Sequence, residues 1–190
     1  LLVHDTGAGA GSGFNVFSTY ELKATPGTYN QSAYYDDITL TRLDPTSPAI
    51  NAAVSRKTQG SAGTFDIDVR AANAVECRKN GPTQVIVTFD KPIQGAGGLD
   101  PSDVTLSSGT VSQVGIDGNT LTIDMAGAAD MSGLIIGFPG ITDAFGTAVT
   151  QSLCFGVLTG DTTGDKKVNV FDLSGIKNNV NKPVSIATFR

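Results

Sequence analysis

Apolar and polar residues alternate along the middle of the chain, which is the pattern of half-buried β-strands. Apolar residues between Thr64 and Val69 take every second position, with aspartates between them, and Gln84–Phe89 repeats the pattern. Further apolar runs lie at Val104–Leu106, Val111–Ile116, Thr120–Met125, Leu134–Phe138 and Ala148–Leu158. Short runs separated by turn-forming residues predict seven or eight strands, and we expect a mainly β protein built on an immunoglobulin-like β-sandwich.

One local signal sets the pairing of two of these strands. Asp117-Gly118-Asn119 separates the runs Val111–Ile116 and Thr120–Met125. An Asp-Gly pair between alternating runs is a strong hairpin signal, because glycine readily enters the backbone conformations of tight turns. We therefore expect these two strands to be antiparallel neighbours.

The same pattern divides the chain into parts. Near the N-terminus, Phe14–Leu22 and Tyr34–Leu43 resemble two strands, too few for a stable sandwich of their own. We interpret them as the end of a further β-sandwich. Pro45 and Pro48 disfavour regular structure and begin a linker. The predicted division is 1–44 for the partial sandwich, 45–63 for the linker and first strand approach, 64–158 for the main sandwich and 159–190 for a C-terminal region.

The periodicity changes in the C-terminal region. Val170, Leu173, Ile176 and Val180 recur at intervals of three and four residues, which places them on one face of a helix. Pro183 and the residues before it end the pattern, because the residue preceding a proline resists the helical conformation. We expect a helix from Val170 to about Val180.

A polar loop precedes this helix and has the spacing of a calcium site. Calcium takes six to eight oxygen ligands, and a twelve-residue loop supplies them from its first, third, fifth, seventh, ninth and twelfth positions. In this chain those positions are Asp161, Thr163, Asp165, Lys167 through its carbonyl, Asn169 and Asp172. Val168, at the eighth position, is expected to anchor the loop to the core. The alternative is a metal-free turn that caps the helix.

The string Gly160 to Leu173 resembles the first calcium-binding repeat of a dockerin, a module that attaches secreted enzymes to cohesin-bearing scaffolds. The resemblance implies an EF-hand-like loop plus helix, bound Ca²⁺ and a cohesin-like partner, and 181–190 resembles the connector that leads to a second repeat. Lys166 stands where the family has glycine, and Thr163 where it has Asn or Asp. With three carboxylates we predict a weaker, extracellular-type calcium affinity. Val170 and Phe171 replace the small hydroxyl residues that the family uses in cohesin contacts.

Two looser resemblances concern the rest of the chain. Residues 55–68 and 75–78 resemble the β-sandwich that precedes such a repeat in secreted bacterial proteins. The string Tyr34 to Leu40 resembles the closing strand of a jelly-roll carbohydrate-binding domain. For Asp36 and Asp37 in that string we weigh a solvated strand face against a second calcium or sugar contact. Both resemblances imply a secreted, extracellular or cell-surface location.

Composition narrows the classes of function. Only Glu21 and Glu76 of the eighteen acidic residues are glutamates, and 23 glycines favour turns over helices. A net charge of −5 argues against nucleic-acid binding, and no apolar run approaches the length of a membrane span. The chain's one histidine, His4, lies near the N-terminus and far in sequence from either cysteine, which gives little support to a catalytic cysteine. We therefore expect no enzyme activity.

The two cysteines admit two interpretations. Cys77 and Cys154 lie near the first and last strands of the predicted sandwich, so a disulfide between them would be expected in a secreted protein. The alternative is a pair of buried free thiols. A bridge between them would close a loop of more than 70 residues and would strongly stabilise the fold.

Three hypotheses for function follow. The first is a non-catalytic structural, adhesive or assembly module that binds calcium. The second is the accessory C-terminal tail of a secreted glycoside hydrolase or other polysaccharide-active enzyme, with carbohydrate as a possible partner. The third is a subunit of a self-assembling extracellular fibre, which would associate through exposed strands or the C-terminal helix.

Overall fold

The computed structural model describes residues 46–189, which belong to one compact unit. The predicted strands in 1–44, with His4, Asp36 and Asp37, lie outside the described residues. Within 46–189 the chain is mainly β, with one α-helix, α1 (Val170–Asn179), and two short 3₁₀ turns, η1 (Gly60–Ala62) and η2 (Pro101–Asp103). No helix in this range combines the length and the apolar character that crossing a membrane requires.

The largest sheet has five strands in the order β2-β1-β4-β8-β7, all antiparallel. They are β1 (Ile50–Thr58), β2 (Thr64–Asp68), β4 (Gln84–Phe89), β7 (Thr110–Asp117) and β8 (Thr120–Ala126). The predicted hairpin is confirmed: Asp117 pairs with Thr120, and Gly118 turns the chain at φ +58°. β1 lies between β2 and β4 and belongs to this sheet. The sheet therefore begins before residue 64, which the sequence pattern had given as the start of the sandwich.

A second sheet has four strands in the order β3-β11-β9-β6. They are β3 (Val75–Glu76), β6 (Thr105–Leu106), β9 (Ser132–Gly137) and β11 (Leu153–Val157). β3 and β11 run parallel, whereas the other pairs are antiparallel. A separate ribbon pairs β5 (Ile93–Gly95) with β10 (Ile141–Asp143). The strands β1, β3, β5 and β10 add to those that the alternating pattern predicted.

The two larger sheets share one hydrophobic core, consistent with a β-sandwich. β4 and β8 contribute its centre, since Val85, Val87, Phe89, Leu121 and Ile123 are fully buried. β9 and β11 supply the facing layer, which includes Leu134, Ile136 and Phe155. In β4 and β8 these are the apolar positions of the alternating runs, so period-two alternation correctly predicted which side of those two strands is buried.

The predicted disulfide is wrong, because both cysteines are free. Cys77 is buried, whereas Cys154 is exposed on β11. The parallel register pairs Glu76 with Val157, so Cys77 lies level with Leu158, four residues beyond Cys154. At about 3.3 Å per strand residue this offset is roughly 13 Å, beyond the reach of a disulfide.

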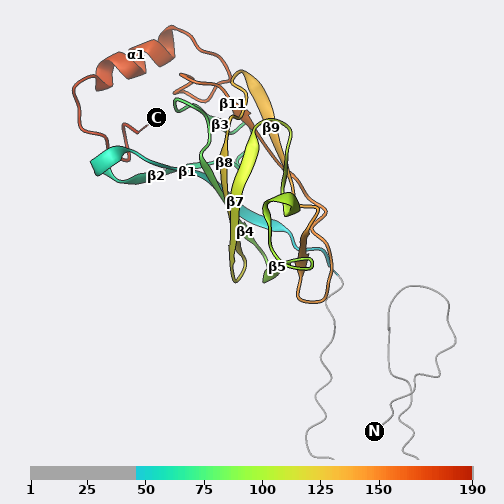
Figure 1. Cartoon of the computed structure of the whole chain (residues 1–190). Helices are drawn as coiled ribbons and strands as arrows, with labels where there is room; N and C mark the ends of the chain where they lie inside the picture. The colour runs from blue at the N-terminus through green and yellow to red at the C-terminus, as the bar shows by residue number, and fades with distance from the viewer. Residues whose placement is uncertain (1–45, 190) are drawn as a thin grey trace, which may run out of the picture. The chain divides into compact units, whose positions relative to one another are not determined.

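The C-terminal region begins where β11 ends. Gly160 N–H donates to the Cys77 carbonyl (2.9 Å), and Thr159 N–H donates to the Asp130 carboxylate (2.8 Å). Figure 1 shows α1 outside the strand layers, with the described end of the chain returning toward β2. There Phe189 stacks on Phe65, with ring centroids 5.3 Å apart. The loop and helix are therefore attached to the sandwich at both ends.

Candidate functional site

Three carboxylates from the predicted loop come together in the structure. Asp161, Asp165 and Asp172 each place a carboxylate oxygen within 4.8 Å of the others. Asp161 and Asp172 are completely buried, whereas Asp165 is exposed. Neither buried carboxylate forms an ion pair with a described residue; the ion pairs in which both partners are described are Arg56–Asp66 and Arg78–Glu76. Two buried anions without a cationic side chain are costly unless other donors or a metal ion stabilise them.

Backbone donors hold Asp161 in place. Its Oδ1 accepts hydrogen bonds from the N–H groups of Gly164 (2.7 Å) and Asp165 (3.1 Å). Its Oδ2 accepts from the Lys166 N–H at 2.8 Å. The chain wraps around this carboxylate because Gly164 and Lys166 both adopt positive φ, +76° and +65°. Lys166 therefore takes the left-handed conformation for which glycine is favoured at the sixth loop position.

Asp172 joins the loop to the helix. Its Oδ1 accepts from the Thr163 N–H (2.9 Å), and its Oδ2 accepts from the Asn169 N–H (2.9 Å). The Asn169 side chain in turn accepts from the Phe171 N–H, so Asn169 and Asp172 form a capping box at the start of α1. Hydrogen bonds from the Thr163 and Asn169 N–H groups lower the pKa of Asp172 to about 2. The carboxylate is thus held in the ionised form that a metal ion requires.

The six predicted ligands are not equally engaged. Thr163 Oγ1 donates to Asp172 (3.0 Å) and lies 3.3 Å from Asp161, so its hydroxyl belongs to the carboxylate cluster. Asp165 accepts from the Lys167 N–H at 2.9 Å, and Asn169 Nδ2 lies 3.4 Å from Asp165. Thr162, which the spacing did not select, points its hydroxyl toward Asp172 at 3.4 Å. The loop spacing alone does not reveal this second hydroxyl.

The donor set fits a hard cation. Carboxylate, hydroxyl and amide oxygens are the ligands that calcium prefers. Asp161 Oδ2 and Asp172 Oδ2 each accept from a single N–H group, so each keeps a lone pair for an ion. The residues that would hold the ion are Asp161, Thr163, Asp165 and Asp172, with the Lys167 carbonyl and Asn169 completing the predicted six. The ion would supply the positive charge that the two buried carboxylates lack among the described side chains.

One expectation about the surroundings of the loop is wrong. Val168 is 57% exposed and does not anchor the loop in the core. It lies instead over Gly160, where a Cβ atom would be 3.6 Å from a Val168 methyl group. The helix is confirmed, but its apolar stripe does not pack on the sandwich, since Leu173 is 63% and Val170 68% exposed. Polar contacts in the loop, rather than apolar packing, position α1.

A second cluster of charge, inside the sandwich, was not predicted. Arg78 and Glu76 form a buried ion pair (Nη2–Oε2 2.6 Å), and Ser55 Oγ donates to the same carboxylate. Arg78 also donates to the carbonyls of Phe65 (2.8 Å) and Ser55 (2.7 Å). Burial alone would raise the pKa of Glu76, but the hydrogen bonds from Arg78 and Ser55 and the charge of Arg78 outweigh it, and the pKa is lowered. Because these groups satisfy one another, the cluster is a structural network rather than an open site.

In comparisons with known proteins, no protein-family model matches the chain, and no curated protein matches it.

Proposed function

We propose that this chain is a non-catalytic, extracellular assembly module in which an immunoglobulin-like sandwich presents a dockerin-like calcium-binding loop and helix. The observation that carries the proposal is the convergence of Asp161, Asp165 and Asp172, two of them buried without a cationic partner among the described side chains. The resemblance of this string to a dockerin repeat supports calcium as the ion and a secreted protein as the setting.

Calcium has a defined structural role in this proposal. It neutralises the carboxylates and so fixes the loop that begins α1 through the Asn169–Asp172 capping box. The loop is bonded to the sandwich at Gly160, and Lys166 Nζ donates to the Asn73 side chain (2.9 Å). Binding therefore orients the helix relative to the strands, and the exposed apolar residues of α1 are presented for assembly.

Thermal melting with and without calcium tests the metal assignment. An affinity of about 10⁻⁴ to 10⁻³ M, typical of extracellular calcium modules, gives roughly 1.4 to 2.7 kcal/mol of stabilisation at ~10 mM calcium. We expect the melting temperature to rise with calcium and to fall again with a chelator. A melting curve that calcium leaves unchanged would support the metal-free helix cap instead.

Charge-matched variants locate the ion. Asp165→Asn removes an exposed ligand charge but keeps an oxygen that accepts from the Lys167 N–H, so the metal-free loop is expected to persist. Its calcium response should shrink markedly. Asp117→Asn, at the exposed end of β7, removes the same charge far from the cluster in sequence and should respond to calcium like the wild type.

The fibre-subunit hypothesis has one structural feature in its favour, the exposed apolar stripe of α1. Val170, Leu173, Ile176 and Val180 all lie on the surface of the described unit. Sedimentation across a range of protein concentrations distinguishes the two proposals. A chain that remains monomeric in calcium contradicts the fibre hypothesis and leaves the assembly-module proposal intact.

A further inference from the structure

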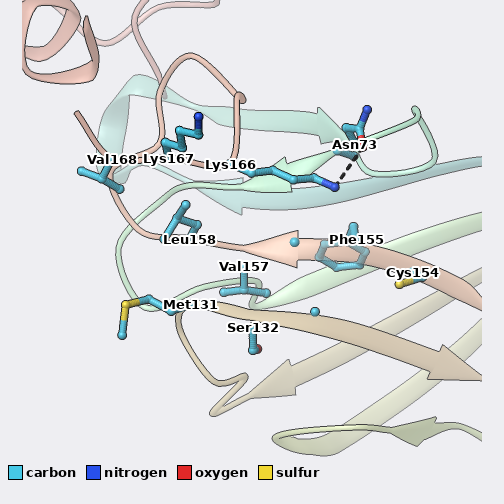
Figure 2. Close-up of a pocket in the computed structure, with 13 residues that line it drawn as sticks. Asn73, Met131, Ser132, Cys154, Phe155, Val157, Leu158, Lys166, Lys167 and Val168 are labelled. Atoms are coloured by element: carbon cyan, nitrogen blue, oxygen red, sulfur yellow. Dashed lines mark hydrogen bonds between the residues drawn. The ribbon is translucent and has the colours of Figure 1, made fainter. Parts of the chain in front are cut away.

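A groove lies between the loop wall formed by 166–168 and the outer face of β9 and β11 (Figure 2). Its volume is about 630 Å³, within the range of sites that bind small ligands or peptide side chains. None of the six predicted metal ligands except Lys167 lines it. The groove is therefore a surface distinct from the carboxylate cluster, although the two share the loop that forms the wall.

The floor of the groove contains two glycines, open above Gly133 and flanked by the Val75 side chain at Gly156. In the β9–β11 register Gly133 faces Gly156, and both are on the outer side of the sheet. A Cβ atom added at Gly133 would meet nothing within 4 Å, so the space above it is open. The absence of a side chain at Gly133 lets the backbone of a ligand approach β9 closely there.

The sides of the groove are apolar and exposed. Met131 is 83% exposed at one side, and Val168 faces the groove from the loop. Ile135 and Cys154, paired in the next row of the sheet, continue the exposed apolar surface. Such a surface favours a ligand that buries apolar side chains.

The charge of the groove is opposite to that of the protein. Its described lining contains Lys166 and Lys167 but no aspartate or glutamate, whereas the chain carries a net charge of −5. Lys166 Nζ is engaged with Asn73 (2.9 Å), as the dashed line in Figure 2 marks. Lys167 Nζ forms no hydrogen bond or ion pair with another described residue. An anionic group on a ligand would therefore complement the positive charge of this surface.

We propose that the groove binds an extended peptide segment of a partner protein in which apolar side chains alternate with carboxylates. The apolar side chains would cover the Gly133–Gly156 floor, and a carboxylate would pair with Lys167. This assignment rests on the proposed assembly role and extends it by naming the chemistry of the partner. The Lys166 and Lys167 N–H groups donate to Asp161 and Asp165, so the groove wall is fixed by the carboxylates of the proposed metal site.

Three synthetic peptides of equal length provide the probe, each fluorescein-labelled and measured by anisotropy against the full chain. One alternates leucine with aspartate, one leucine with lysine, and one serine with aspartate. We expect the leucine–aspartate peptide to bind at least about tenfold more tightly than either of the others, because only it satisfies both the apolar floor and the lysine wall. Equal binding of the leucine–aspartate and leucine–lysine peptides would overturn the proposal.

Two variants place the peptide in the groove. Lys167→Glu should weaken the leucine–aspartate peptide about tenfold and strengthen the leucine–lysine peptide, a reversal that misfolding does not produce. Gly133→Leu should fill the open floor and abolish binding. Its matched control is Gly115→Leu on β7, where an added Cβ also meets nothing within 4 Å but the groove is not involved. Loss of binding in both glycine variants, or in neither, contradicts the assignment.

The exposed thiol gives an independent readout. Cys154 lines the groove, whereas Cys77 is buried, so a thiol reagent should label Cys154 first. Bound leucine–aspartate peptide should slow that labelling, and unchanged labelling at saturation would contradict binding in the groove.

Concentration-dependent dimers that disappear in Gly133→Leu would show a second copy as the occupant and would also overturn the proposal. Peptide binding that is equal in calcium and in chelator supports the groove but contradicts the calcium dependence of its wall.

Discussion

The sandwich and the C-terminal helix follow the same kind of apolar pattern but use it differently. In the sandwich, alternating apolar residues such as Val85 and Leu121 are completely buried between the two sheets. In α1, the apolar residues at three- and four-residue intervals are exposed, with Leu173 at 63%. Periodicity correctly predicted the type of element in both regions, but burial followed only where a facing layer exists.

The contrast shows that different interactions position the two regions. The sandwich is held by its shared apolar core, whereas α1 is positioned by the carboxylates of Asp161 and Asp172 and their backbone donors. A helix of ten residues is marginal by itself and gains its order from attachment to the rest of the protein. The loop is therefore the element on which the orientation of the exposed stripe depends.

The largest effect is expected from the Arg78–Glu76 ion pair, which is buried inside the sandwich. Glu76→Gln leaves Arg78 as a buried charge without its carboxylate, which should lower the free energy of unfolding by about 3 to 5 kcal/mol at neutral pH. Asp66→Asn breaks the Arg56–Asp66 pair, whose side chains are 42% and 34% exposed, and should cost less than about 1 kcal/mol. Urea denaturation measures both, and similar costs would contradict the role of burial.

The same pair predicts how stability depends on pH. The folded protein lowers the pKa of Glu76 from its usual 4.5, so protonation favours the unfolded chain. The stabilisation is complete above pH 4.5 and is lost as the pH falls through the folded-state pKa. Glu76→Gln removes this titration, so the wild type and the variant should converge in stability below that pH. A constant difference across the acid range would contradict the assignment.

A matched pair of leucines tests the comparison most simply. Leu121→Ala removes a fully buried side chain from β8 and should cost about 2 to 5 kcal/mol, because it leaves a cavity in the core. Leu173→Ala truncates an exposed side chain of α1 and should change stability by less than about 0.5 kcal/mol. Equilibrium unfolding in urea gives both values. A large loss in Leu173→Ala would mean that the stripe is covered in solution.

A smaller effect is expected where the end of the chain contacts the sandwich. Phe189 stacks on Phe65, and the Arg78 guanidinium lies 5.8 Å from its ring centroid. Phe189→Ala should cost about 1 kcal/mol and make the segment after α1 more sensitive to limited proteolysis. Ile186→Ala, which alters an exposed residue of the same segment, should change neither property. Equal sensitivity of the two variants would show that Phe189 does not fasten the segment.

Much of the fold was predictable because it depends on local alternation. Thr64–Asp68, Gln84–Phe89 and the hairpin at Gly118 all appear where the pattern placed them. The two-residue strand β3 and the β5–β10 ribbon were missed, because two or three residues are too few to show a period. β1 was missed as a central strand because Asn51 and Ala52 interrupt its alternation at a register shift.

The candidate site was predictable in part for a similar reason. The spacing of Asp161, Asp165 and Asp172 lies within one loop, so local sequence is enough to bring them together. The Ser55–Glu76–Arg78 network and the Phe65–Phe189 stack join residues far apart in the chain, and no sequence period records such contacts. The disulfide prediction failed for a different reason. The chain segments that carry Cys77 and Cys154 are adjacent, but the two thiols are offset along the strand direction.

Hydrogen–deuterium exchange with and without calcium tests the central claim most directly, that calcium in the Asp161–Asp172 loop orders α1. At about millimolar calcium we predict slower exchange across 161–179, which contains the carboxylate cluster and the helix, with little change in β4 and β8. Asp165→Asn should lose most of that protection, and Asp117→Asn should keep it. Exchange across 161–179 that is identical in calcium and in chelator would contradict the account.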